Sequence, residues 1–395
     1  MIIPFSLLIA QPGQVPVHVG ANNTSQMVQQ RVNQEQIQRL ERQMASEVAQ
    51  QKMVGCVGLV MRNGRLLWSA GIGYANLESR SPMRPDAIFQ VMSMTKPVAA
   101  VAAMILVERG QLRLHDPVAD YLPEFSSIKV KGEGGLKDPA SAPRVRQLFQ
   151  HTSGIASDTP ISDEDRASLT LAQFVKLVSE QPLFADPGTA ERYSGPAVST
   201  LGRIVEVVSG QRFEDFCQKE IFDPLGMKDT HYFLPASKSG RLAMVYRIED
   251  GKIEKDSGDP LRKGARFANP AGGLYSTASD MAAFHQMMAN GGILADKRVL
   301  APLTVRAMTT ISSPTILPGA SQDLGYGLMW SIVRGPAPSR SLQTPGSFGH
   351  AGAFGTYGWV DPSQGLVAIF MSQRAWGADR EIDLFRAMVN ASLRQ

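Results

Sequence analysis

The sequence predicts an α+β fold, with one antiparallel sheet built from strands near both ends of the chain and a mostly helical lobe inserted between them. Strand-like runs occur before residue 70 and again after residue 355. The stretch from about 110 to 270 is typical of helices and long loops, including the Gly/Pro-rich residues 131–143. Residues 98–107 are all apolar, which predicts a buried central helix too short to span a bilayer.

The first predicted elements are a helix and a hairpin. Residues 35–51 have apolar side chains at every third or fourth position, which favours an amphipathic helix. These side chains are Ile37, Leu40, Met44 and Val48. Residues 56–61 and 65–69 are strand-like and flank Asn63-Gly64, a dipeptide that favours a two-residue hairpin turn.

The last third of the chain repeats this mixture of helix and strand. Thr277 is placed to cap a helix over residues 281–289. Residues 356–360 and 366–372 are predicted as strands, and residues 380–393 as a closing helix.

Composition indicates a globular protein with a large core. The 395 residues are 43% apolar and 19% charged, and 40 basic residues against 36 acidic ones give a net charge of +4. Because the charges are dispersed, nucleic acid is not indicated as a partner. No transmembrane helix is expected, and the sequence does not define an oligomeric state.

The N-terminal residues differ from the rest. Residues 1–33 are expected to form an extended arm, since residues 11–33 are polar. Residues 2–10 are apolar, but no lysine or arginine precedes them, so they make a poor secretory signal. A cytoplasmic location is therefore favoured, with a secreted or periplasmic one open if these residues are a truncated signal.

Neither the cysteines nor most of the histidines indicate a cofactor. Cys56 and Cys217 lie far apart in sequence, and two buried free thiols are expected, although a single bridge remains open. Four scattered histidines show no metal-ligand spacing, so no metal site is expected. They are His18, His115, His231 and His285.

The strongest chemical signal is Ser93-Met94-Thr95-Lys96 at the start of the apolar run. On a helix, residues three apart share a face, so the serine hydroxyl and the lysine amine can meet. A lysine kept neutral by burial can act as the base that activates a serine. Taken alone, the motif favours an N-capping serine with an exposed lysine, and only its context favours a catalytic pair.

Two further segments are candidates to join Ser93 and Lys96 in one site. Tyr193 lies on a loop before a helical pattern over residues 198–209. Residues 348–355 are glycine-rich and lead into a strand, where glycine lets the backbone approach a ligand.

With these segments in view, residues 35–395 resemble the class C β-lactamases, the DD-peptidases and the family VIII carboxylesterases. The order of the Ser-x-x-Lys, Tyr-Ser-x and His-x-Gly motifs carries the resemblance. Several other stretches match the same family. They are Leu114–Val118, Tyr121–Phe125, His151–Gly154, Pro224–Met227, Gly272–Thr277 and Tyr326–Leu328.

The resemblance implies a β-lactamase/DD-peptidase-like fold over residues 34–395, with terminal helices covering the sheet, a helical lobe roughly within 106–270 and the site between them. It implies that Ser93 is acylated and that Lys96 and Tyr193 together form the general base. The backbone N–H groups of Ser93 and Ala353 would form the oxyanion hole.

The departures from the family motifs favour an esterase. Lactamases end the second motif in asparagine, where this chain has Gly195, and carry lysine in the third, where it has His350. Both residues hold the antibiotic in lactamases. His350 and Gly352 are expected to line the substrate site, although a structural role for His350 is equally open. No Gly-x-Ser-x-Gly elbow is present, so an α/β-hydrolase is not indicated.

The sequence therefore predicts a serine hydrolase that cleaves small, short-chain acyl esters without a cofactor. The alternatives are a β-lactamase, a D-amino-acid peptidase or an acyltransferase of the same fold. A non-catalytic scaffold is disfavoured by the intact Ser93, Lys96 and Tyr193.

Five other residues near the motifs have weaker assignments. His151 is expected to be structural, at a helix end and turn. Met92 and Met94 either shape an acyl pocket or fill the core, the latter being favoured. Trp330 and Trp359 either wall the cleft or are buried.

Overall fold

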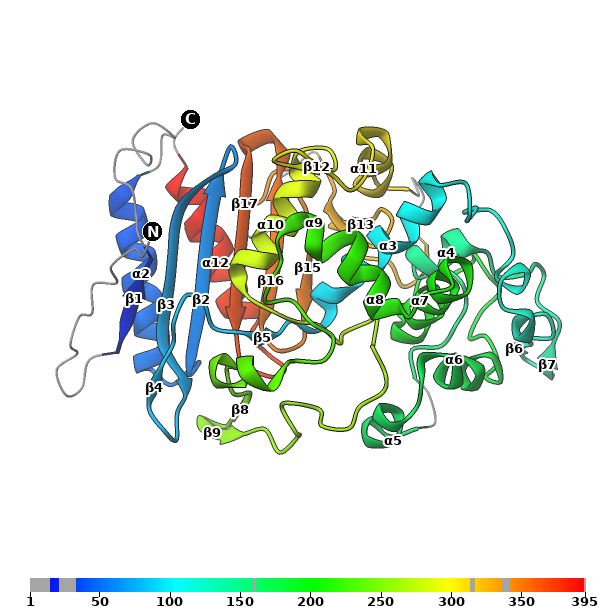
Figure 1. The fold of residues 1–395 in the computed structure, drawn as a ribbon, viewed down its shortest axis with the longest axis horizontal. Coiled ribbons are helices and arrows are strands. Elements are labelled where there is room, and N and C mark those ends of the chain that lie inside the picture. The colour runs from blue at the N-terminus through cyan, green and yellow to red at the C-terminus, as the bar shows by residue number, and fades with distance from the viewer. Residues whose placement is uncertain (1–14, 21–32, 159–160, 313–316, 336–341, 394–395) are drawn as a thin grey trace.

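The architecture is that of a computed structural model, which describes residues 15–20, 33–158, 161–312, 317–335 and 342–393 (Figure 1). Predictions for residues 2–10 and for most of the N-terminal arm lie outside the described residues. Within the arm, β1 (Val17–Val19) is extended and pairs with β3 at one edge of the main sheet.

The main sheet is antiparallel at every described pairing, and it joins strands from both ends of the chain. In spatial order its strands are β1, β3 (Arg65–Asn76), β2 (Gly55–Arg62), β17 (Leu366–Ser372), β16 (Thr356–Asp361), β15 (Phe348–Gly352), β14 (Ser331–Val333) and β13 (Leu324–Tyr326), with β4 (Ser81–Pro82) beside β3. The predicted α+β class and the strands over 356–360 and 366–372 are confirmed.

The first hairpin has the predicted turn. Asn63 and Gly64 have φ values of 48° and 74°, the left-handed conformation that a two-residue type I′ turn requires at both positions. The turn sets the register in which Arg62 pairs with Arg65.

The sheet separates two hydrophobic clusters, because side chains alternate along its central strands. In β17, Val367 and Ile369 pack into the larger cluster, whereas Ala368 and Phe370 pack into the smaller one. Two terminal helices, α2 (Gln34–Ala49) and α12 (Asp379–Ser392), cover the smaller cluster, as Figure 1 shows along the outer side of the sheet.

The predicted amphipathic helix is confirmed in α2. Its four expected core side chains are all buried: Ile37, Leu40, Met44 and Val48. Asn33 caps the helix by accepting hydrogen bonds from the backbone N–H groups of Glu35 and Gln36.

The predicted buried helix is also confirmed, as α3 (Lys96–Glu108). Every residue from Lys96 to Leu106 is buried, so the helix forms the centre of the larger cluster. It packs against α7 (Gly195–Ser209), while α10 (Ala278–Ala289), capped by Thr277 as predicted, packs on β16 and β17.

Helices dominate the middle of the chain, on the side of the molecule away from α2 (Figure 1). The remaining helices are α4 (Val145–Phe149), α5 (Asp163–Ser168), α6 (Leu171–Ser179), α8 (Phe213–Cys217), α9 (Asp223–Leu225) and α11 (Pro302–Met308).

The predicted mostly helical lobe also contains two small hairpins that the sequence pattern did not indicate. These are β6 (Val130–Gly132) with β7 (Gly135–Lys137), and β8 (Tyr246–Glu249) with β9 (Lys252–Lys255). Their strands are three or four residues long and largely exposed, so they lack the apolar alternation that reveals a strand.

The aromatic residues near the C-terminal motif belong to the core. Trp330 and Trp359 are fully buried, which decides between the two roles left open for them. Met94 is buried in the larger cluster as well.

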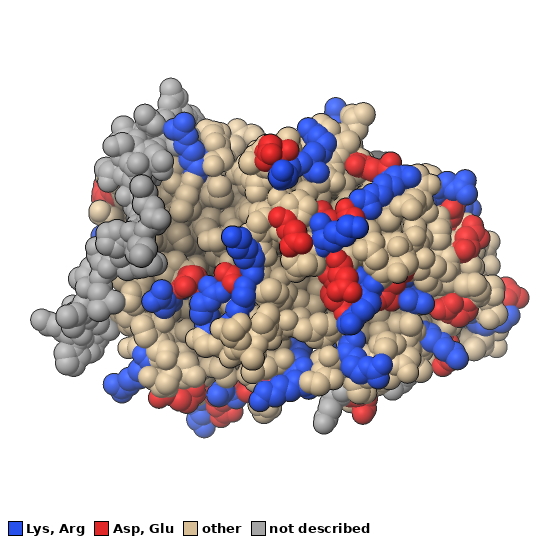
Figure 2. All heavy atoms as spheres, viewed as in Figure 1, with Lys and Arg blue, Asp and Glu red and all other residues tan. Residues whose placement is uncertain are grey.

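Charged side chains of both signs are interspersed over the face shown in Figure 2. Among the described residues, no helix is both long and apolar enough to cross a membrane.

Candidate active site

Ser93 lies in a tight turn that leads directly into the buried helix. The turn is the 3₁₀ segment η1 (Met92–Thr95), which continues into α3. The Thr95 hydroxyl donates to the Met92 carbonyl over 2.6 Å and supports the positive φ of 49° at Met92. Ser93 is half-buried at the mouth of the helix, where unpaired backbone N–H groups favour negative charge.

Lys96 meets Ser93 as the three-residue spacing predicts. Its Nζ lies 2.8 Å from Ser93 Oγ and 2.6 Å from the carbonyl oxygen of Ala271. The side chain is only 3% exposed, and burial lowers the pKa of Lys96 to about 7. Within the described part of the chain no carboxylate pairs with it, so near neutral pH a large fraction is the free amine.

Hydrogen bonds within its own loop and to the serine turn hold the Ala271 carbonyl in place. The Asn269 side chain accepts the N–H of Ala271 at 2.9 Å, and the Asn269 carbonyl accepts the N–H of Gly273 at 2.8 Å. Leu274 N–H donates to Thr95 Oγ1, which ties the loop to the serine turn. A backbone acceptor has no residue-type signature, so only the family-like glycines after it were a signal.

Tyr193 comes from the loop before α7, as predicted, and its hydroxyl lies near the Ser93 side chain. Lys96 Nζ lies 4.6 Å from the centre of its ring. Burial raises the pKa of Tyr193, while the interaction with the Ser93 hydroxyl opposes this. Because 42% of the residue is exposed, solvent moderates the shift. Ser93, Lys96 and Tyr193 therefore form one contiguous group.

His350 lies on β15, with its ring centre 6.1 Å from that of Tyr193. Its Nδ1 is 2.7 Å from the carbonyl oxygen of Ala351, so Nδ1 carries the proton and donates. Burial, reinforced by Lys96, lowers the pKa of His350 to about 3. The residue is thus neutral at physiological pH and supplies no cation.

Gly352 allows the end of β15 to pack on the chain just before Ser93. A Cβ atom at this position would lie 2.2 Å from Thr356 Oγ1 and 2.3 Å from the Val91 carbonyl oxygen. The Thr356 hydroxyl donates to that same carbonyl at 2.9 Å. Ala353 follows in the turn, and its carbonyl accepts from the N–H of Trp376.

A pocket of about 290 Å³ lies next to the loop whose Ala271 carbonyl accepts from Lys96. It shares Ala271 with the lysine-binding loop and Gly195 with the tyrosine segment. A Cβ atom at Gly195 would meet the Ala271 Cβ at 3.6 Å, an ordinary contact, so a side chain fits there. The other lining residues are Ser157, Asp158, Ile161, Arg166, Phe174, Pro196, Ser199, Phe267 and Asn269.

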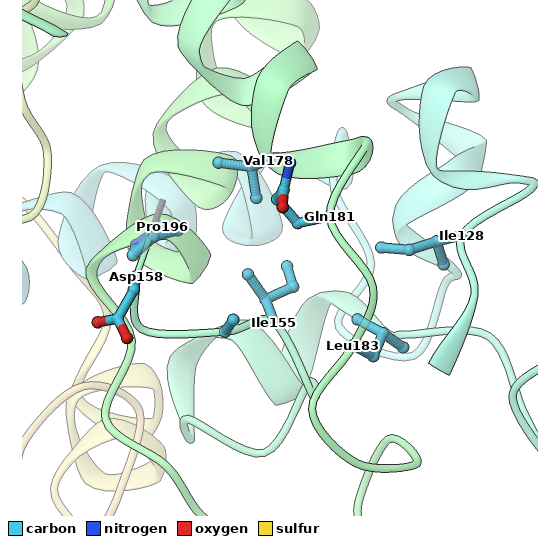
Figure 3. A pocket seen from close by; sticks show the side chains of 8 residues that line it. Ile128, Ile155, Asp158, Val178, Gln181, Leu183 and Pro196 are labelled. Carbon is cyan, nitrogen blue, oxygen red and sulfur yellow. The ribbon is translucent and has the colours of Figure 1, made fainter. Parts of the chain in front are cut away.

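A second cavity, drawn in Figure 3, also borders Pro196, but it is too small to hold a substrate. It is lined mainly by apolar side chains, among them Ile155, Val178 and Leu183, and its volume is about 10 Å³. That is barely the space of one water molecule.

His151 lies directly beside the tyrosine, with ring centres 4.6 Å apart. It ends the turn after α4, as expected, and is buried. Sequence reasoning missed its contact with Tyr193 because 42 residues separate them. Among the described residues, no three His, Cys, Asp or Glu side chains gather where they could hold a metal ion.

An antiparallel sheet with a helical insertion, and a serine, lysine and tyrosine in mutual contact, define the class of the β-lactamase-like serine hydrolases. The model of a family described as Beta-lactamase matches residues 37–392, so the chain belongs to the β-lactamase family.

The chain is similar to several known proteins along most of its length. Protein Rv1367c of Mycobacterium tuberculosis is 32% identical over 369 residues, covering 86% of this chain and 90% of that protein. Esterase EstB of Burkholderia gladioli is 29% identical, covering 83% and 88%. The structure of EstCE1, described as "a hydrolase with promiscuous acyltransferase activity", has a TM-score of 0.76 at 22% identity and covers 90% of this chain and 99% of its own.

Proposed function

We propose that this hydrolase is a serine esterase that cleaves small acyl esters through an acyl-enzyme on Ser93. The observation that carries the proposal is the amine of Lys96, with a pKa of about 7, 2.8 Å from Ser93 Oγ. The Tyr193 hydroxyl lies near the same serine. A nucleophile and a base within hydrogen-bond reach are the requirement for covalent catalysis.

Acylation follows from these contacts. The lone pair of Lys96 takes the Oγ–H proton as Oγ bonds to the ester carbonyl carbon. When the tetrahedral intermediate collapses, the C–O bond to the alcohol breaks, and Tyr193 gives its proton to the departing oxygen. Lys96 then returns a proton to Tyr193. In deacylation, water loses its proton to the same pair, and Ser93 Oγ leaves with a proton restored.

The developing oxyanion would be held by the backbone N–H groups of Ser93 and Ala353. Supporting this, neither group donates to another described residue, and the packing at Gly352 holds the end of β15 against the serine turn. Removing one such donor typically costs about 2.7–4 kcal/mol of transition-state stabilisation.

Esters are favoured over β-lactams because the two groups that hold a lactam are missing. Gly195 offers no side-chain amide, and His350 is neutral and buried. Each hydrogen bond to a charged group is worth about 1.5–3 kcal/mol. The pocket of about 290 Å³ beside Gly195 has a largely polar lining and lies at the lower end of ligand pockets in volume, which suits a small substrate.

Transfer of the acyl group to an alcohol is the second candidate. The chemistry differs only in the acceptor, and EstCE1, which shares this fold, is described as having promiscuous acyltransferase activity. A D-amino-acid peptidase or a lactamase would need holding groups that Gly195 and His350 do not provide.

A panel of p-nitrophenyl esters beside nitrocefin tests the proposal. We expect rapid turnover of acyl groups of about two to six carbons and little or no cleavage of nitrocefin. Gly195→Asn combined with His350→Lys should shift kcat/KM toward the lactam. Nitrocefin turnover as efficient as that of p-nitrophenyl butyrate in the unaltered protein would replace the esterase by a lactamase.

A further inference from the structure

His151 makes three contacts with Tyr193 and the residues on either side of it. Its backbone carbonyl accepts the N–H of Arg192 at 2.9 Å, and its Nδ1 accepts the N–H of Ser194 at 3.2 Å. Its ring lies 4.6 Å from the tyrosine ring. The backbone N–H groups of the residues before and after Tyr193, and the ring of Tyr193 itself, thus contact a single residue that is 1% exposed.

These contacts define the chemical state of the imidazole. Because Nδ1 accepts a backbone N–H, the proton of the neutral ring is on Nε2. Burial, followed by the nearby Lys96 and His350, lowers the pKa of His151 well below its usual value. The ring is therefore neutral and cannot serve as an acid near neutral pH, and Nδ1 is already occupied by Ser194.

The backbone of His151 is itself fixed. Its φ is +57°, the left-handed region in which asparagine and glycine are at ease and most side chains are strained. The next residue, Thr152, donates to the Gln147 carbonyl at 3.0 Å and accepts from Gly188 at 2.7 Å. On the side of β13, the Tyr326 ring packs edge-on against the imidazole at 5.3 Å.

Tyr193 needs such a support, since it lies on a loop and is 42% exposed. Two other hydrogen bonds of this loop are made to backbone carbonyls: Ser157 Oγ donates to the Tyr193 carbonyl, and Ser194 Oγ donates to the Ala156 carbonyl, each at 2.8 Å. A misplacement of about 1 Å in a reacting group can cost about a hundredfold in rate.

We propose that His151 is a positioning residue for Tyr193, which keeps the tyrosine hydroxyl at Ser93 by accepting the Ser194 N–H and supporting the ring. This inference rests on the proposed function, in which Tyr193 transfers the proton. It assigns to His151, the first residue of the His-Thr-Ser-Gly turn, a role in catalysis through the tyrosine, with no contact to the substrate.

Two substitutions separate this role from simple packing. Asn and Gly both tolerate the left-handed φ of His151, but only the Asn Oδ1 can replace Nδ1 as the acceptor for Ser194 N–H. We expect His151→Gly to lower kcat for p-nitrophenyl butyrate by about a hundredfold, with KM changed less than about threefold. His151→Asn should recover at least about tenfold of that loss.

The matched control is Ser153→Ala, in the same buried turn. Among the described residues, Ser153 Oγ accepts a hydrogen bond from the N–H of Ile155 and makes no contact with Tyr193. Removing this hydroxyl should therefore change kcat by less than about threefold. Circular dichroism and Tm of all variants, with assays run well below the lowest Tm, verify that each is folded. Equal kcat values for the Asn and Gly variants, or a His151→Gly variant as active as the unaltered protein, would overturn the inference.

A double-mutant cycle tests the route through the tyrosine. In a Tyr193→Phe background, His151→Gly should cost less than about threefold in the rate of labelling by a serine-reactive phosphonate, because the hydroxyl it positions is already absent. An undiminished loss in that background would show a role independent of Tyr193. If instead Tyr193→Phe itself is fully active, the proposed mechanism fails, whatever His151 does.

Discussion

The proposed acylation of Ser93 depends on Lys96, which has no carboxylate partner among the described residues. Lys96 is held by one carbonyl and one hydroxyl, and its burial in α3 is not offset by any negative charge among the described residues. The folded state therefore favours the free amine, the form able to remove a proton from serine. Local sequence is enough to predict the Ser93–Lys96 pair, but the depth of its burial is a property of the fold.

Activity should follow the ionisation of this lysine. With a pKa of about 7 for Lys96, only the deprotonated form is a base, so kcat should fall as pH decreases through about 7. His350, with a pKa of about 3, is neutral throughout and adds no second step near neutrality. A pH–rate profile with p-nitrophenyl butyrate between about pH 5 and pH 9 checks this, and a flat profile would mean that Lys96 is not the base.

The lowered pKa of Lys96 also reduces the stability of the folded protein at pH values where the lysine of the unfolded chain is protonated. Between about pH 7 and 10.5 the unfolded chain binds more protons at Lys96 than the folded chain does, so stability rises with pH across this window. Lys96→Met should be more stable than the unaltered protein at pH values below about 7, and the difference should shrink toward pH 10.5. Each pKa unit is about 1.4 kcal/mol, which makes the gain on the order of a few kcal/mol.

Urea unfolding of both proteins at the two ends of that window measures this difference. A Lys96→Met variant that is less stable than the parent at low pH would show that the lysine is not held neutral by burial.

Lys96 and Tyr193 should behave as one unit. Lys96→Ala and Tyr193→Phe should each lower kcat by about 10²–10⁴-fold. The double mutant should lose far less than the product of the two, because both serve a single proton transfer. Multiplicative losses in a steady-state assay would mean that the two residues act independently.

At the scale of elements, the site depends on the contact between the end of β15 and the serine turn. Gly352→Ala would place a Cβ atom 2.3 Å from the Val91 carbonyl and push the two apart. We expect a lower Tm and a loss of kcat of at least about tenfold, since the donor at Ala353 moves away from Ser93. Gly134→Ala, where a Cβ atom meets nothing within 4 Å, is the matched control. Equal behaviour of the two variants would contradict this account.

Elements with strong local signals could be predicted from the sequence. The apolar spacing of α2, the Asn63-Gly64 turn and the helix after Thr277 all depend on neighbours in the chain. In contrast, β13 and β14 are three residues each and form by pairing: β13 with β14, and β14 with β15, a partner that a short sequence window does not contain.

The site was predictable to the same extent. The side chains at Ser93, Lys96 and Tyr193 carry recognisable chemistry. The carbonyl of Ala271 and the role of His151 arise from contacts between segments tens to hundreds of residues apart, and no residue type or spacing encodes them.

At the scale of the whole molecule, the sheet keeps the two cysteines in separate cores. Cys56 packs with the terminal helices and Cys217 with the larger cluster, both as buried free thiols. Burial raises the pKa of each thiol, so neither is a ready nucleophile. A thiol reagent such as DTNB should leave the folded protein unmodified and react with both cysteines after denaturation. Rapid reaction of either one in the folded protein would contradict this packing.

Intact-mass spectrometry of the protein treated with a p-nitrophenyl alkyl phosphonate tests directly whether Ser93 is the nucleophile. We expect a single adduct, mapped to Ser93 by peptide analysis, and none in a folded Ser93→Ala variant. An adduct on another serine, or undiminished labelling and ester hydrolysis in Ser93→Ala, would contradict this assignment.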